Sequence, residues 1–328
     1  MIIKTPSRLH MTLIDLNGSY GRFDGSVGLT INGPHFILES EETEKGITID
    51  FEDSITDSTL MEACIHKIAS SAEKTINQYN VETGFHFHVK QAIIPHSGLG
   101  SGTQISLAAA KSICEHIGKE VTSVELGTLV GRGGTSGIGT FSFDLGGLIA
   151  DGGHSSKEKS TFLPSSASTA KPPRLIGRYD FPEDWNILIA IPPANNDVAG
   201  SKEVNIFQSY CPVPRNEVEQ ISHVVFMNLI PYMLEHDIEN FGQCINMIQS
   251  RGFKKVEVSL QPSNVTNLMN FMRDNGAYGV GMSSFGPSIY TIYDKNNKDI
   301  VKSTEEYLDG EGTIITTKAQ NHGYELKK

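Results

Sequence analysis

Hydrophobic and polar residues follow two different periods in the first part of the chain. Across residues 1–51, short apolar runs are separated by turn residues such as Asn17-Gly18, a pattern that predicts antiparallel strands. From Thr59 to Gln78, apolar residues recur at helical spacing and predict an amphipathic helix. Residues 85–89 alternate apolar and polar side chains, as expected of a half-buried strand.

The second half of the chain alternates predicted strands with predicted helices. The strands are Trp185–Ile191, Ser288–Tyr293 and Thr313–Thr317, and the helices are Glu217–Glu235, Asp237–Ser250, Pro262–Asn275 and a last one near Lys302–Leu308. Residues 155–174 and 193–214 are predicted to be loops. We therefore predict two α+β domains, residues 1–170 and 171–328, the second with helices on one face of an antiparallel sheet.

Composition narrows the class of protein. The chain has 328 residues and a net charge of −11, which disfavours a general nucleic-acid binder and leaves room for a local basic pocket. The four cysteines form no CxxC pair, so we expect buried thiols. Neither a signal peptide nor an 18-residue apolar run is evident, so we expect a cytoplasmic protein with no membrane role.

The first stretch with candidate chemistry is a glycine loop that leads into an alanine-rich helix ending near Ile117. Its candidate phosphate-binding residues are Gly98, Leu99, Gly100, Ser101, Gly102, Thr103 and Gln104. Glycines allow the backbone to turn and approach a ligand, and a helix N-terminus offers free N–H groups and a partial positive charge. The simpler alternative is a turn that only joins a strand to a helix.

A second glycine-rich stretch covers residues 131–153 and follows a helix predicted over Thr122–Val130, with Ser123 as its N-cap. Arg132, Asp144 and Asp151 lie between its glycines. Two interpretations are open: a second wall of the site, or tight packing of the backbone around a helix and a hairpin.

The glycine loop resembles the phosphate loop of the GHMP kinase superfamily, Pro-x-x-x-Gly-Leu-Gly-Ser-Ser-Ala, with Pro95 one residue closer and Gly102-Thr103 in place of Ser-Ala. Glycine-bearing stretches near residues 5–30 and at 279–287 extend the resemblance along the chain. The resemblance implies a two-domain α+β fold, with an N-terminal domain like ribosomal protein S5 domain 2, a ferredoxin-like C-terminal domain, and the ligand between them.

Within the superfamily, the chain is most similar to the beta-ribofuranosylaminobenzene 5'-phosphate synthases. The similarity is carried by Ser7–His10, Leu13–Gly18, Gly21–Leu29, Ser97–Gln104 and Gly131–Gly147. It implies that 5-phosphoribosyl-1-diphosphate and 4-aminobenzoate condense to the aryl riboside 5'-phosphate, CO2 and pyrophosphate, in archaeal tetrahydromethanopterin biosynthesis. It also implies Mg²⁺ as cofactor and a homodimer.

One position separates this reaction from phosphoryl transfer. GHMP kinases often carry Ser-Gly-x-Asp where this chain has Ser136-Gly137-Ile138-Gly139. Glycine cannot accept a proton, so a kinase would lose a general-base contribution of about 10²–10⁴ in rate. An ATP-dependent small-molecule kinase and a binding protein without catalysis remain the alternatives.

The synthase interpretation assigns roles to charged residues. The candidate catalytic residues are Asp15, Arg22, Asp24 and Asp144, and the candidate substrate-binding residues are Arg8, His10 and Arg132. A carboxylate, Asp15 first, would stabilise an oxocarbenium-like sugar, and arginine would bind a carboxylate or phosphate through its two-pronged geometry. Alternatively, Asp15 forms an Asx turn, and Arg22 and Asp24 form a solvated pair. No metal ligands are assigned.

Overall fold

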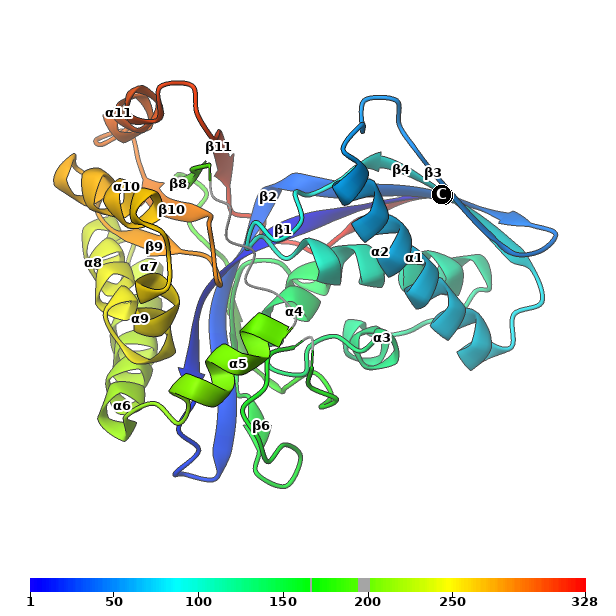
Figure 1. The fold of residues 1–328 in the computed structure, drawn as a ribbon, viewed down its shortest axis with the longest axis horizontal. Helices are drawn as coiled ribbons and strands as arrows, with labels where there is room; N and C mark the ends of the chain where they lie inside the picture. The colour runs from blue at the N-terminus through cyan, green and yellow to red at the C-terminus, as the bar shows by residue number, and fades with distance from the viewer. Residues whose placement is uncertain (166, 194–200) are drawn as a thin grey trace.

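Two sheets and their covering helices form the fold in the computed structural model, which describes residues 1–165, 167–193 and 201–328 (Figure 1). The larger sheet has the strand order β12-β1-β2-β4-β3; β5 and β6 also pair with β2, and β7 pairs with β5. Its strands are β1 (Ile2–Asp15), β2 (Arg22–Thr43), β3 (Ile47–Phe51), β4 (Gly84–Gln91), β5 (Leu148–Asp151), β6 (His154–Ser155), β7 (Leu175–Tyr179) and β12 (Glu325–Lys327).

The first two strands are longer than the predicted short runs. β1 and β2 pair antiparallel along most of their length, and register shifts occur between Thr5 and Ser7 and between His10 and Thr12. Both faces of these strands are largely buried, so the simple alternation of apolar and polar residues is lost.

Helices cover the larger sheet. They are α1 (Ser58–Tyr79), α2 (Ser101–His116), α3 (Ser123–Val130) and α4 (Ile138–Asp144). The predicted helix over 59–78 is confirmed as α1. For α3 the N-cap is Thr122 and not the predicted Ser123, because Thr122 and Glu125 form a reciprocal capping box. The alanines of α2 are buried, which allows this helix to pack tightly between the sheet and α1.

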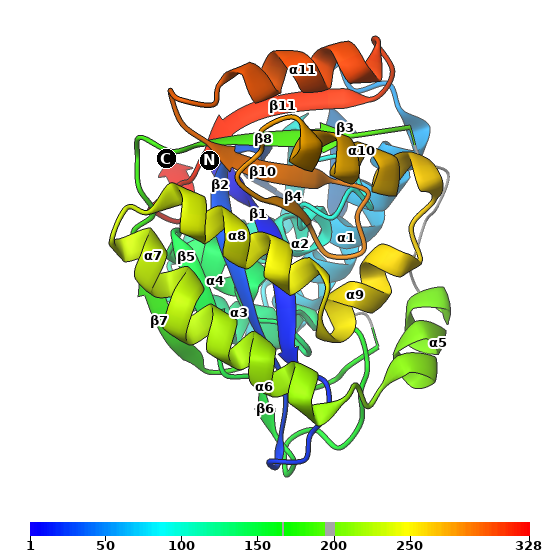
Figure 2. The same ribbon diagram turned by 90° about the vertical axis from the view of Figure 1, so that its left-hand side faces the viewer.

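The smaller sheet belongs to the second half of the chain and has the antiparallel order β11-β8-β10-β9. Its strands are β8 (Asn186–Ile191), β9 (Val280–Met282), β10 (Ile289–Tyr293) and β11 (Thr313–Lys318). Leu188 and Ala190 pack in one apolar cluster with α10 and α11, whereas Ile187 and Ile189 belong to the cluster that contains α8. Helices therefore lie on both faces, which corrects the prediction of one covered face (Figure 2).

The helices of the second half are α5 (Ser201–Tyr210), α6 (Arg215–Val224), the π-helical turn η1 (Val225–Leu229), α7 (Ile230–Leu234), α8 (Ile238–Gln249), α9 (Gly252–Ser259), α10 (Ser263–Asp274) and α11 (Asp299–Leu308). Two of them were not predicted. α5 occupies part of the stretch predicted as a loop, residues 193–214, of which 194–200 lie outside the described residues. α9 follows α8 after a short turn and is too short to show a clear period.

Segments from both ends of the chain meet at β1. In Figure 1, α1–α4 lie on one side of β1 and β2, and α6 and α8–α10 lie on the other. β7 and β12 lie beyond residue 170 yet belong to the larger sheet, so a division at that residue separates the two sheets only in part. Among the described residues, no helix combines the length and apolar character needed to cross a membrane.

Candidate functional site

A cavity of about 410 Å³ lies where the glycine loop, β1 and the second glycine-rich stretch meet. β1 contributes Arg8, His10 and Leu13. The loop and α2 contribute Gly98, Gly100, Ser101, Gly102 and Thr103, and the second glycine-rich stretch contributes Arg132, Gly133, Thr135, Ser136 and Gly139. Residues of α1, α5, α9 and the glycine-bearing stretch 279–287, called the C-terminal glycine stretch below, complete the wall.

The glycine loop directs the N-terminus of α2 toward this cavity. Gly100 is the N-cap residue, has a φ of 88° and supplies no side-chain acceptor to the helix. The first residues of α2, Ser101 to Thr103, line the cavity. The free N–H groups and partial positive charge of a helix N-terminus suit an anion. The predicted glycine loop before a helix N-terminus is therefore present, and phosphate binding there stays a prediction.

The C-terminal glycine stretch fastens the loop in place. The Gly98 carbonyl accepts hydrogen bonds from Ser283 Oγ at 2.7 Å and from the Arg8 guanidinium. Ser283 Oγ also accepts a hydrogen bond from the His10 amide at 2.9 Å, and the Ser284 amide donates to the His10 carbonyl at 3.0 Å. Hydrogen bonds thus connect β1, the glycine loop and the C-terminal glycine stretch at the cavity, although the three segments are far apart in the sequence.

We expect Gly98→Ala to destabilise the protein more than Gly118→Ala does. Gly98 has a φ of 86°, and a Cβ there would lie 2.3 Å from the Ser283 carbonyl oxygen. Gly118 has a φ of 65° with nothing within 4 Å of its Cβ position. Both variants carry the strain of a left-handed residue, about 1–2 kcal/mol. The difference between their urea-unfolding free energies measures the contact with Ser283, and equal values would contradict it.

Three cations face the cavity: Arg8, Lys67 and Arg132. Burial and the nearby Arg132 lower the pKa of Arg8 to about 10, while Glu257 opposes the shift. Burial and Arg132 also lower the pKa of Lys67. Arg132 lies against α2, since a Cβ on Gly102 would be 2.6 Å from Arg132 Nη2. These cations repel one another, so the arrangement favours binding of a multiply charged anion.

His10 is a neutral side chain in this wall. Burial lowers its pKa well below the usual 6.5, and the charges of Arg8 and Lys254 lower it further. Its Nδ1 atom is buried and has no hydrogen-bond partner among the described residues. His10 can therefore offer a hydrogen bond to a ligand without adding a charge.

Among the described residues, two carboxylates that the sequence-based site assignment did not include line the cavity: Glu203 on α5 and Glu257 on α9. Glu257 is 3% exposed and forms an ion pair with Lys254, whose ammonium donates to the carbonyls of Met282 and Ser284 at 3.1 Å. Glu203 raises the pKa of Arg132 against the lowering effect of burial. Glu203 lies in the long segment 193–214, whose length alone was a sequence signal, whereas the neighbours of Glu257 suggest an ordinary surface charge.

The structure brings Arg8, His10 and Arg132 into the cavity wall but none of the four predicted catalytic residues. Asp15 Oδ1 accepts hydrogen bonds from the amides of Asn17 and Gly18 at 2.9 Å, which is the Asx-turn alternative. Arg22 is exposed and donates to the carbonyls of Gly152 and Gly153. Asp144 is exposed and accepts from Ser123 Oγ at 3.1 Å.

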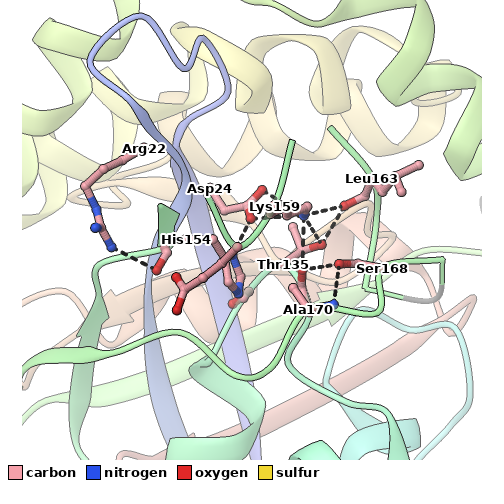
Figure 3. Close-up of polar contacts among 12 residues, drawn as sticks. Arg22, Asp24, Thr135, His154, Lys159, Leu163, Ser168 and Ala170 are labelled. Carbon is pink, nitrogen blue, oxygen red and sulfur yellow. Dashed lines mark hydrogen bonds and ion pairs between the residues drawn. The ribbon is translucent and has the colours of Figure 1, made fainter. Parts of the chain in front are cut away.

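Asp24 is fully buried and has a φ of 66°. Its carboxylate lies 2.6 Å from His154 Nδ1 and 3.0 Å from Lys159 Nζ, so the predicted solvated pair with Arg22 does not form. Figure 3 shows the Lys159 ammonium between Asp24 and Thr135, with Arg22 to one side. Because Thr135 lines the cavity, this cluster supports the cavity wall from behind.

Two predicted phosphate-binding residues have other contacts. Leu99 is 1% exposed and packs in the core, and its carbonyl accepts from the Arg8 amide. Gln104 is buried and donates from Nε2 to the Gly139 carbonyl at 2.9 Å. A Cβ on Gly139 would lie 3.1 Å from Thr103 Cγ2, so α4 packs closely on α2 at the position where kinases often carry aspartate. Neither Leu99 nor Gln104 lines the cavity.

The side chains of the described residues show no preformed metal site. Among the described residues, no group of three or more His, Cys, Asp or Glu side chains could hold a metal ion. The cavity itself offers carboxylates and hydroxyls on several elements. A Mg²⁺ ion that keeps most of its ligands from substrate phosphates and water needs no more than this.

Comparisons with known families and structures agree on the fold. Residues 63–147 match the family described as GHMP kinases N terminal domain, and residues 229–304 match GHMP kinases C terminal. The mevalonate kinase of Methanococcus jannaschii superposes with a TM-score of 0.68 at 15% identity, covering 98% of both chains. The GHMP-kinase-like two-domain α+β fold expected from the sequence is confirmed.

Relatives at higher identity cover nearly the whole chain. A protein of Methanothermobacter thermautotrophicus is 49% identical over 98% of this chain and 97% of its own length. A protein of Archaeoglobus fulgidus is 42% identical over 99% of both chains. Both bear the name beta-ribofuranosylphenol 5'-phosphate synthase. A homoserine kinase of Methanococcus maripaludis is 25% identical over 82% of this chain and 82% of its own length.

Proposed function

Because the chain belongs to the beta-ribofuranosylphenol 5'-phosphate synthase family of the GHMP kinase superfamily, we propose that it is a decarboxylating pentosyltransferase. It joins the ribosyl carbon of 5-phosphoribosyl-1-diphosphate to the ring of a para-substituted benzoate and releases CO2 and pyrophosphate. The observation that supports this most is a cavity in which a helix N-terminus faces Arg8, Lys67 and Arg132. Such a cavity suits a substrate with a diphosphate and a second phosphate.

The ring acceptor is part of this proposal. The sequence comparison implied 4-aminobenzoate and left 4-hydroxybenzoate open as the alternative, and the names of the relatives specify a ribofuranosylphenol, which carries a ring hydroxyl. We therefore propose 4-hydroxybenzoate and 4-aminobenzoate as the two acceptors to compare. Both have the planar carboxylate that an arginine recognises through two parallel hydrogen bonds.

The cavity residues suit the proposed reaction. The leaving diphosphate gains negative charge, which the α2 N-terminus and Arg132 are placed to stabilise. The sugar gains positive charge at C1, which a carboxylate stabilises. Glu203 and Glu257 line the cavity and are the carboxylates proposed for this role. Asp15, the choice made from sequence, does not line the cavity. The ring carbon that bears the carboxylate then attacks C1.

Mg²⁺ is a further part of the proposal. Glu203 and the Ser101 hydroxyl are cavity groups that would hold the ion together with substrate phosphate oxygens and water. When bound, Mg²⁺ neutralises charge that develops on the departing diphosphate. Chelation with EDTA is expected to abolish turnover, and added Mg²⁺ is expected to restore it.

The test is a stoichiometric assay with Mg²⁺, 5-phosphoribosyl-1-diphosphate and each acceptor. The proposal expects pyrophosphate and CO2 in equal amounts. The kinase alternative expects ADP from ATP and a hydroxylated acceptor, with no pyrophosphate from the phosphoribosyl donor. A binding protein without catalysis would show only ligand-dependent stabilisation in thermal unfolding. Either of the last two outcomes would overturn the proposal.

We also propose a cytoplasmic homodimer that acts in tetrahydromethanopterin biosynthesis. This follows from the family and from the small-molecule character of the proposed substrates. Light scattering of the purified protein tests the dimer. Loss of the product and of tetrahydromethanopterin in a deletion strain tests the pathway.

A further inference from the structure

A line of hydrogen-bonded side chains leads from the cavity to a buried carboxylate. Ser136 lines the cavity, and its Oγ lies 2.7 Å from Ser26 Oγ. The Ser26 hydroxyl in turn donates to Asp151 Oδ2. Ser26 and Asp151 are both fully buried. The two serine hydroxyls therefore form a continuous path between the cavity and a carboxylate that has no solvent exposure of its own.

The fold places these three residues with precision because each is held by backbone pairing. Ser26 and Asp151 are direct partners in the antiparallel register of β2 and β5, so their side chains extend from the same face of the sheet. Asp151 also accepts hydrogen bonds from the amides of Gly137 and Gly153, each at 2.9 Å. Gly137 is the N-cap of α4 and follows Ser136 directly. The carboxylate thus fixes the loop that carries Ser136.

The hydrogen bonds in this line have one direction. Asp151 accepts from two amides and from the Ser26 hydroxyl, so the Ser26 proton is committed to the carboxylate. The Ser26 oxygen is then free to accept the proton of Ser136. This leaves the Ser136 oxygen as an acceptor, used by the Ile138 amide at 3.3 Å and open to a hydroxyl in the cavity. Every proton in the line points toward Asp151.

The electrostatic surroundings suit Asp151 as a proton acceptor. Burial, with a smaller effect of the negative charge of Asp24, raises its pKa to about 6 against the opposing hydrogen bonds from Ser26, Gly153 and Gly137. Asp24 is itself neutralised by Lys159 and, when protonated, His154. A base with a pKa near the working pH transfers protons most effectively in both directions.

We propose that Asp151 accepts the proton of the acceptor's ring hydroxyl through Ser136 and Ser26 while the ring attacks the sugar, and returns that proton when CO2 leaves. The proposal rests on the proposed function, and it requires an acceptor seated between the glycine loop and α4. The position of Ser136 supports this seat. It lies three residues before Gly139, which packs against Thr103 of the glycine loop.

The step balances without any further reactant. In the first half, the bond from C1 to the diphosphate breaks and the bond from C1 to the ring carbon forms. The hydroxyl proton moves to Ser136, the Ser136 proton to Ser26 and the Ser26 proton to Asp151, which leaves a neutral ring ketone. In the second half, the bond to the carboxylate breaks, and its electron pair restores the aromatic ring. The ring oxygen then takes its proton back along the same path.

An amine acceptor does not need this path. When a ring amine donates its lone pair during attack, it forms an iminium ion that is stable without losing a proton. A ring hydroxyl forms a protonated ketone, which is strongly acidic and must lose its proton as it forms. The line from Ser136 to Asp151 therefore favours hydroxyl over amine acceptors, and this difference separates a chemical role from a structural one.

The experiment compares 4-hydroxybenzoate and 4-aminobenzoate as acceptors for the wild type and for Ser136→Ala and Asp151→Asn. Each variant is expected to lower kcat with 4-hydroxybenzoate by about 100-fold or more, the usual size of a general-base contribution. With 4-aminobenzoate the loss for Ser136→Ala is expected to stay below about fivefold. Ser136→Thr keeps a hydroxyl and is expected to retain most of the hydroxybenzoate activity.

The matched control is Ser142→Ala, which removes another buried hydroxyl between α4 and β2. Ser142 Oγ accepts from Thr30 Oγ1 at 3.0 Å and does not line the cavity. It is expected to leave the ratio of the two acceptor activities unchanged. Urea unfolding of Asp151→Asn checks its stability, and Ser136→Ala at the cavity end keeps the test decisive if Asp151→Asn fails to fold.

The outcomes separate this proposal from the proposed function. Equal losses with both acceptors, or no loss with 4-hydroxybenzoate, would overturn the proton path and leave the transferase intact. A wild-type enzyme that uses 4-aminobenzoate alone would do the same. A wild-type enzyme that releases pyrophosphate with neither acceptor would overturn the transferase and the proton path together.

Discussion

Arg132→Ala is expected to lower kcat/KM for 5-phosphoribosyl-1-diphosphate by about 100-fold, since two charge-assisted hydrogen bonds of about 1.5 kcal/mol each would be lost. Arg132 lies beside the first turn of α2, as the distance of 2.6 Å from its Nη2 to the Cβ position of Gly102 shows. Its Nε is buried and has no hydrogen-bond partner among the described residues. A diphosphate at the helix N-terminus would supply the missing acceptor.

Steady-state kinetics with the donor varied at saturating acceptor measure this effect. Arg132→Lys keeps the charge but cannot donate two parallel hydrogen bonds. We therefore expect its kcat/KM for the donor to lie between that of the wild type and that of the alanine variant. Lys302→Ala removes a highly exposed cation on α11 and serves as the charge control. If Arg132→Ala changed only the KM of the benzoate, the diphosphate would have to be assigned to another part of the cavity.

Lys159→Met is expected to destabilise the protein by about 3–5 kcal/mol, the usual cost of removing one partner from a buried ion pair. Lys159 is 6% exposed, and its ammonium donates to both carboxylate oxygens of Asp24 at 3.0 and 3.1 Å. It also donates to Thr135 Oγ1 and to the carbonyls of Gly134 and Leu163 (Figure 3). Without it, the Asp24 charge keeps only His154, and three acceptors lose a donor.

Urea unfolding monitored by circular dichroism measures this change. Lys157→Met is the matched control, because Lys157 is exposed two residues away and its loss should change stability little. The double variant Asp24→Asn with Lys159→Met removes both charges and is expected to be more stable than Lys159→Met alone. A Lys159→Met protein as stable as the Lys157→Met protein would show that the buried pair contributes nothing.

Much of the fold and part of the site follow from local sequence. Helical spacing of apolar residues over 59–78 depends only on neighbours along the chain, so α1 agrees with its prediction. The glycine loop is equally local, since glycines that adopt positive φ before a run of alanines specify a turn into a helix. The family is carried by contiguous motifs, and its identification from them is confirmed.

The catalytic assignments depended on contacts between distant segments, which local patterns do not contain. The Asx turn of Asp15 is local, and the sequence already offered it as an alternative. The contact of Asp24 with Lys159 joins two distant segments, and only the packing shows it. Glu257 looks like a surface charge until α9 packs against β1 and the C-terminal glycine stretch.

By itself, therefore, the sequence determined most of the helices and strands, the glycine loop and the family, because these depend on periodicity and contiguous motifs. Only the tertiary structure decided which charges share the cavity and which are structural. It also joined Ser136 to Asp151 through Ser26. The physical reason is that strand register and helix packing bring together side chains more than a hundred residues apart, and no property of either segment alone specifies its partner.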